Sequence, residues 1–175
     1  TMQFRSANTI ARDLDLFTHN GVTYAGVTPS KENDAARGKV LAKRKAVKSM
    51  AFAPNNGVYE IVVDFASSLK RPVEITLRNA KGEKVVMVYN AAEGTFAMNR
   101  AASGDCKFSD AFPVTTTAPV HGTMRTLRLF VDKCSIEAVD ADGRMSMTNL
   151  VFPSLPYSSI QVAGGKAAVT VYDIK

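Results

Sequence analysis

Short apolar runs, in which polar and apolar positions partly alternate, dominate the chain. They are rich in Val, Ile, Thr and Tyr, the residue types that favour β-strands, and the clearest of them span residues 22–28, 58–66, 73–79, 84–90 and 167–174. Turn-forming pairs such as Asn20-Gly21 and Asp142-Gly143 stand between such runs. Roughly ten to thirteen strands at this spacing predict an all-β fold: a two-sheet antiparallel β-sandwich of the jelly-roll or concanavalin-like type.

Helical periodicity is nearly absent. Residues 30–46 contain helix-forming side chains, but Gly38 interrupts them and no apolar stripe recurs at helical spacing. The pattern therefore predicts at most a single helical turn, over residues 31–36.

One run near the C-terminal end, LRLFVDKCSIEAVDADGRMSMTNLVFP (127–153), begins with a segment that is apolar on both faces. Leu127 and Leu129 are predicted to point to one side of the sheet, and Cys134 and Ile136 to the other. A strand of this kind belongs in the middle of a packed structure rather than at an edge.

Composition and charge change this picture little. With 175 residues, 46% of them hydrophobic, the chain has the size and composition of one soluble globular domain. The net charge of +6 comes mostly from scattered side chains, and the one basic run, residues 38–48, is interpreted as the solvent face of a strand. Because this run has no aromatic residue to stack on bases, we predict no nucleic-acid partner. No apolar run approaches the ~18 residues of a membrane-spanning helix, so we predict no membrane partner.

The side chains that carry chemistry do not form a recognisable catalytic set. Asp132 and Glu137 lie an odd number of residues apart, which on a regular strand places them on opposite faces, so they are not expected to flank one bond. His19 and His121 stand in loop-like segments and are predicted to be exposed. Nucleophile, phosphate-loop and metal-ligand motifs do not occur. We therefore predict no catalytic residue, no cofactor and no metal site.

The cysteines and aromatic residues point to a core rather than to a site. Cys106 and Cys134 lack metal-ligand spacing and lie in strand-like runs, so buried free thiols are expected, with a disulfide as the open alternative. The chain has no Trp, the best platform for a sugar ring, and Tyr59 and Tyr89 are expected to pack inside. Sugar binding therefore stays open without direct support.

The run 127–153 resembles the C-terminal β-sandwich of glycoside hydrolase family 32, the family of levanases, inulinases, invertases and sucrose-6-phosphate hydrolases. The family pattern is kept at Asp132, Glu137, Gly143, Phe152 and Pro153. The run departs from the pattern at residue 134, where Cys replaces the usual Ser, and at residues 138–139.

Two further segments match the family in the expected order. FAMNRAASGD (96–105) keeps Arg100 and Gly104 of a family segment, and SANTIARDLDLF (6–17) keeps Arg12 and Leu14 of the linker between the family's two domains. The second segment has Ala11 where the family has Pro. Together the three segments extend the resemblance over nearly the whole chain.

The resemblance implies that the catalytic half is missing. In this family an N-terminal five-bladed propeller carries the catalytic residues in Trp-x-Asn-Asp-Pro, Arg-Asp-Pro and Glu-Cys motifs, none of which occurs here. Residues 1–36 are then expected to be a linker arm and outer strands leading from the propeller, and residues 37–175 the sandwich. The polar start at Thr1 likewise suggests a piece of a longer polypeptide.

The implied function is that of a non-catalytic accessory domain of a β-fructosidase, with the propeller of the same polypeptide as its partner. The alternatives are a fructan-binding module, with fructan as partner, and a stand-alone hydrolase, which would release fructose by itself. The parent enzyme is expected to be secreted or periplasmic, and a cytoplasmic location stays open.

The family-pattern residues are expected to be structural. Glu137 should accept hydrogen bonds from Arg128, Arg144 or loop amides, because an unpaired buried carboxylate costs several kcal/mol. A contact with the propeller or with a bound sugar is the alternative role. The candidate residues are Arg100, Asp132, Glu137, Gly143, Phe152 and Pro153.

Overall fold

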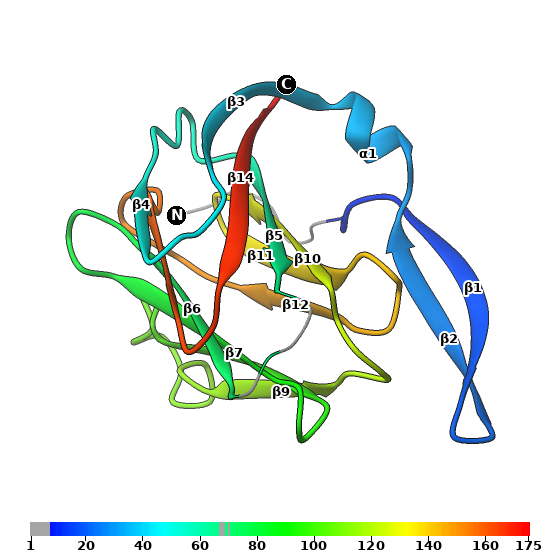
Figure 1. The fold of residues 1–175 in the computed structure, drawn as a ribbon. Helices are drawn as coiled ribbons and strands as arrows, with labels where there is room; N and C mark the ends of the chain where they lie inside the picture. Colours follow the sequence, from blue (N-terminus) through cyan, green and yellow to red (C-terminus); the bar gives the residue numbers. More distant parts are fainter. Residues whose placement is uncertain (1–7, 67–68, 70) are drawn as a thin grey trace.

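The protein is a two-sheet sandwich with a projecting hairpin (Figure 1). The computed structural model describes residues 8–66, 69 and 71–175. These residues form two six-stranded antiparallel sheets and a separate two-stranded sheet. The predicted all-β sandwich is confirmed. Residues 1–7, which begin the predicted linker arm, lie outside the described residues.

The first sheet contains the longest buried strands. In spatial order its strands are β12 (Ser146–Leu150), β11 (Ser135–Asp140), β10 (Thr126–Asp132), β5 (Tyr59–Phe65), β14 (Ala167–Ile174) and β3 (Arg37–Arg44). β10 lies inside this sheet, as expected for a strand that is apolar on both faces. β3 lies at an edge and exposes Lys39, Lys43 and Arg44, and such charges discourage pairing with another chain.

The second sheet covers the inner face of the first. In spatial order its strands are β4 (Ser49–Ala51), β13 (Ser159–Ala163), β6 (Val73–Arg78), β7 (Lys84–Asn90), β8 (Thr95–Ala102) and β9 (Thr115–Pro119). The five strands predicted from alternation correspond to β2, β5, β6, β7 and β14.

A hairpin of β1 (Arg12–His19) and β2 (Val22–Pro29) precedes the sandwich and stands to its right in Figure 1. Its turn is Asn20-Gly21, and both residues have positive φ, 50° and 77°, as a two-residue hairpin turn requires. The helical turn α1 (Glu32–Ala35) then leads into β3 and confirms the predicted turn.

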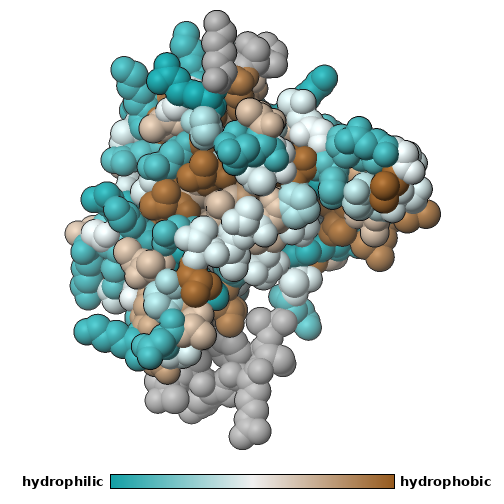
Figure 2. Space-filling view, turned by 90° about the horizontal axis from the view of Figure 1, so that it is seen from below, coloured by the Kyte–Doolittle hydropathy of each residue, from teal (hydrophilic) through white to brown (hydrophobic). Residues whose placement is uncertain are grey.

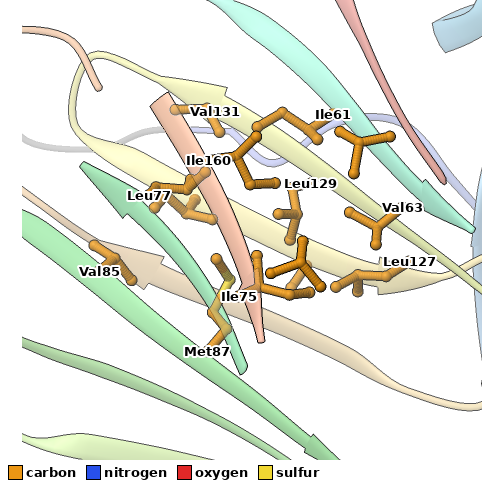
Figure 3. Packing of buried hydrophobic residues seen from close by; sticks show 14 of the residues in the cluster. Ile61, Val63, Ile75, Leu77, Val85, Met87, Leu127, Leu129, Val131 and Ile160 are labelled. Atoms are coloured by element: carbon orange, nitrogen blue, oxygen red, sulfur yellow. The ribbon is translucent and has the colours of Figure 1, made fainter. Parts of the chain in front are cut away.

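The core lies between the two large sheets. Figure 3 shows the inner-facing side chains packed together, among them Ile61, Val63, Ile75, Leu77, Val85, Met87, Leu127, Leu129, Val131 and Ile160. Tyr59 and Tyr89 are buried here as predicted, and each hydroxyl has a partner. Tyr59 donates to the carbonyl of Tyr157 at 3.0 Å, and Tyr89 accepts from the amide of Met124 at 2.9 Å.

The faces predicted for residues 127–139 are partly wrong. The chain reverses between β10 and β11, so counting residues across the turn does not give the face of a side chain. The register pairs Val131 with Ile136 and Phe130 with Glu137. Ile136 therefore points into the core. Asp132 and Glu137 share the outer face of the first sheet, contrary to prediction.

Candidate functional site: the docking site of the N-terminal arm

Glu137 holds the N-terminal arm, here residues 8–11, against the outer face of the first sheet. Its carboxylate accepts the backbone amide of Ile10 at 3.0 Å and forms an ion pair with Arg12. The Arg12 guanidinium also donates to Ser146 at 2.9 Å and to Thr148 at 3.0 Å on β12. One carboxylate therefore fixes a segment that is distant in sequence.

The predicted partners of Glu137 are only partly right. A loop amide does bind it, but neither Arg128 nor Arg144 does. The arginine that pairs with Glu137 is Arg12, from the segment that resembles the family linker. Sequence spacing gave no sign of this pairing because the two residues are 125 positions apart.

A second ionic cluster lies on the same outer face and was missed in the sequence. Glu60 is fully buried, and its carboxylate accepts hydrogen bonds from Arg128 at 2.5 Å and from Arg37 at 2.6 and 2.8 Å. Asp34 of α1 bonds to Arg128 at 2.7 Å and lies 3.4 Å from Arg37. The one available signal was a Glu inside the apolar run 58–66, since buried carboxylates require partners. This cluster fixes α1 and β3 onto the sheet.

Gly143 is the contact point for the hairpin. Its φ of 74° closes the turn before β12, and its carbonyl accepts the amide of Val27 at 3.2 Å. A Cβ at this position would stand 3.0 Å from the Thr28 side chain and 3.2 Å from the Val27 nitrogen. Glycine is therefore needed both for the turn and for the close approach of β2.

Two acidic side chains of this region accept hydrogen bonds from backbone amides of the turns in which they lie. Asp132 is exposed, and its carboxylate accepts the amide of Lys133 at 2.6 Å. Asp140 is buried and accepts the amides of Asp142 at 3.4 Å and Arg144 at 3.2 Å. Burial raises the pKa of Asp140 to about 6, and the two amide bonds only partly offset this.

The other family-pattern residues form a separate cluster. The Arg100 guanidinium lies 4.2 Å over the Phe112 ring and donates to the carbonyl of Leu150 at 3.3 Å. Phe152 stacks on Phe112 at 5.5 Å, and its carbonyl accepts the amide of Asp105 at 2.9 Å. A Cβ on the neighbouring residue 104 would overlap that carbonyl, so glycine is required there. Pro153 follows in the same half-buried loop. The structure thus brings Glu137 to the arm and Gly143 to the hairpin, and leaves Arg100, Phe152 and Pro153 elsewhere.

Aromatic and basic side chains hold the hairpin against the sandwich. Tyr24 stacks on His121 with ring centroids 4.0 Å apart, and Arg144 lies 4.6 Å over the Phe17 ring. His19, at the end of β1, is 5.6 Å from His121. His121 lies in a loop as predicted, but His19 belongs to β1, and both side chains are half-buried rather than exposed. Both cysteines are free thiols as expected, and Cys134 is buried, but Cys106 is only half-buried and lies in a loop.

A cavity of about 250 Å³ adjoins Glu137, with Phe130, Asp132 and Ser135 also in its wall.

Among residues 8–66, 69 and 71–175, no group of three or more His, Cys, Asp or Glu side chains is placed to hold a metal ion. Within that same part of the chain, no helix is long and apolar enough to cross a membrane.

The fold and the docking site together define a class: a β-sandwich domain whose N-terminal arm and hairpin are fixed to one outer face by ion pairs. Residues 26–175 match the family described as glycosyl hydrolases family 32 C terminal. The chain belongs to this family.

Proteins similar in sequence support this family assignment. The chain is 26% identical over 182 residues to levanase of Bacillus subtilis (strain 168), which covers 98% of the chain and 27% of that protein. It is 32% identical over 122 residues to levanase of Bacillus sp. (strain L7), covering 65% of the chain and 13% of that protein. The chain thus spans about a quarter or less of the length of these relatives.

A solved structure shows the same fold. Exo-inulinase from Aspergillus awamori superposes with a TM-score of 0.84 and 22% identity, over 100% of the chain and 37% of that protein. The chain therefore has the fold of one part of a larger enzyme, the C-terminal domain of family 32 enzymes such as levanases and inulinases.

Proposed function

We propose that the chain is the non-catalytic accessory domain of a fructan- or sucrose-cleaving enzyme and that it stabilises the catalytic propeller of the same polypeptide. Residues 1–36, the predicted linker arm with its outer strands, connect the two domains, and residues 37–175 form the sandwich. The family-pattern residues then have structural roles in holding this arm and the neighbouring loops.

The apolar outer face of the hairpin carries this proposal. Leu14 is 77% exposed and Leu16 is 70% exposed, although neither lies at the turn. They pair across the hairpin with Val27 and Ala25, so the four side chains share one face. Figure 2 shows apolar side chains gathered on the hairpin at the right of the view.

This face is rigidly presented, which is what a domain interface needs. The hairpin is fixed by the Arg12–Glu137 pair at its start and by the bond from Val27 to Gly143 along β2. Covering exposed apolar surface gains about 25 cal/mol per Å², and clustered exposed apolar side chains typically mark an interface. The occupant is the N-terminal part of the polypeptide, because the family is a C-terminal domain and the levanase relative is almost four times longer than its matched segment.

Fructan binding is the second candidate, and one observation favours it. Phe108 is 58% exposed, and its ring packs against those of Phe112 and Phe152, with centroid distances of 4.6 and 5.5 Å. An exposed ring supported from beneath is a suitable surface for a sugar face.

A calorimetric titration with levan and inulin oligosaccharides, with fructose measured in the same samples, separates the candidates. The accessory function predicts no saturable heat and no fructose. Saturable heat that disappears in Phe108→Ala would make the chain a fructan-binding module. Release of fructose by the purified chain would contradict both functions.

A further inference from the structure

A groove separates the hairpin from the sandwich, and its wall combines aromatic and basic side chains. Its volume is about 260 Å³, and its walls come from β1, β2, the end of β9, the loop before β10, and the turn before β12 with the first residue of that strand. Phe17 and Tyr24 line it on the hairpin side, and His121 and Arg144 on the sandwich side. Ala25, Val27 and Ser146 also line the groove, so it adjoins both the apolar hairpin face and the contact of Arg12 with β12.

Three basic side chains lie in or beside the groove and are called the basic row here: Arg144 and His121 line it, and His19 adjoins His121. The amide of His121 donates to the carbonyl of Arg144 at 3.3 Å, so the two residues are backbone neighbours. The ring centroids of His19 and His121 are 5.6 Å apart. Within the described part of the chain, the Arg144 guanidinium forms no ion pair with a carboxylate. It lies over the face of Phe17 and interacts at longer range with the Asp140 carboxylate.

We propose that this row, Arg144, His121 and His19, is a binding site for a small oxyanion such as sulfate, phosphate or a carboxylate. Guanidinium and imidazolium groups are the side chains that bind such anions with directed, charge-assisted hydrogen bonds. A metal ion fits less well, since two imidazoles fall short of the three or four protein ligands of a zinc site and Arg144 adds a positive charge beside them.

A bound oxyanion would link the hairpin to the sandwich, because His19 belongs to β1 and the other two residues to the sandwich. Protonation of either imidazole adds positive charge to the row, so binding is expected to strengthen as the pH falls through the range in which histidine titrates. Other charged or titratable groups of the surrounding elements are Asp15 of β1, Tyr24 of β2, and Asp140 and Asp142 of the turn before β12. Of these carboxyls, only the buried Asp140 adjoins Arg144, through its backbone amide.

The chain offers a direct test because His19 and His121 are its only two histidines. The imidazole C–H proton signals are followed by NMR while sulfate replaces chloride at constant ionic strength. Sulfate keeps its charge over the pH range, so any pH dependence of binding comes from the protein. Both signals are expected to shift saturably, and their titration midpoints to move to higher pH in sulfate. A parallel titration with acetate tells whether a carboxylate is accepted as well.

Arg144→Gln is expected to weaken sulfate binding at least about tenfold, whereas Arg78→Gln, an exposed position on the second sheet, should leave it unchanged. Arg144→Lys keeps the charge and should give an intermediate affinity. The spectrum itself reports whether each variant is folded. The site is ruled out if sulfate causes no saturable shift, if Arg78→Gln weakens binding as much as Arg144→Gln, or if zinc rather than sulfate shifts both signals at stoichiometric amounts.

Discussion

At the residue scale, buried charge decides which positions tolerate change. Glu60, Glu137 and Asp140 are buried carboxylates, but they differ in their compensation. Glu60 has two arginines, Glu137 has one arginine and one amide, and Asp140 has amides alone. Replacing each of them should therefore have a different effect.

Asp140 should lower the stability of the protein as the pH rises. Its pKa of about 6 in the folded state lies above the ordinary value of 3.8. Below pH 3.8 both states hold the proton. Between that pH and about 6 the unfolded chain releases it first, so stability falls by at most about 3 kcal/mol. In urea unfolding, the stability of the parent chain minus that of Asp140→Asn should fall across this range, because the other carboxyls contribute equally to both proteins and the amide oxygen of the substituted side chain still accepts a turn N–H. Parallel curves would contradict the raised pKa.

Glu60→Gln should be strongly destabilising. It leaves Arg37 and Arg128 without their buried carboxylate, and breaking a buried pair costs about 3–5 kcal/mol. Glu74→Gln, at an exposed position of β6, is the control and should change stability by less than about 0.5 kcal/mol. Urea midpoints measure both. Equal effects would show that the Glu60 cluster contributes no more than a surface charge.

At the element scale, the sequence predicted the strands better than their connections. Alternation of Val, Ile and Tyr marks β5, β6, β7 and β14, because each strand reports its own burial pattern. The reversal between β10 and β11 was not apparent, since both strands are apolar and no glycine marks the turn. The partner of Glu137 could not be found either, because an ion pair across 125 positions depends on the whole fold.

The arm should detach when its ion pair is broken. In Arg12→Ala, Glu137 keeps its bond to the Ile10 amide but loses the arginine that orients it. In Glu137→Gln, a neutral amide oxygen replaces the carboxylate, and it no longer forms an ion pair with Arg12 and accepts more weakly from the Ile10 amide. Native-state hydrogen exchange at this amide should become at least about tenfold faster, while amides of β5 keep their protection.

The double variant with both changes should be no worse than either single change, because both remove the same contact. Additive effects would mean that Arg12 and Glu137 stabilise the arm independently. Arg78→Ala serves as a control with no expected effect.

At the scale of the whole molecule, fold and family could be predicted from the sequence, and the place of the exposed apolar face could not. The turn spacing was sufficient to predict the sandwich, and the run 127–153 was sufficient to indicate glycoside hydrolase family 32. The exposed face of β1 was not predicted, because a strand in which Leu14 and Leu16 alternate with aspartates has the pattern of a half-buried strand. Only the position of the hairpin, outside both large sheets, shows that these side chains are uncovered.

The most direct test is the thermal unfolding of the full-length polypeptide, in which we propose that a catalytic propeller precedes this chain, compared with that of the chain alone. Leu14→Asp combined with Leu16→Asp should leave the melting temperature of the isolated chain nearly unchanged, since both side chains already face water. In the full-length polypeptide the same change should lower it by several degrees, whereas Leu155→Asp, at an exposed leucine in the loop before β13, should not. An equal response of both polypeptides to the double change, or no response in the full-length one, would contradict the proposal that the hairpin joins the two domains.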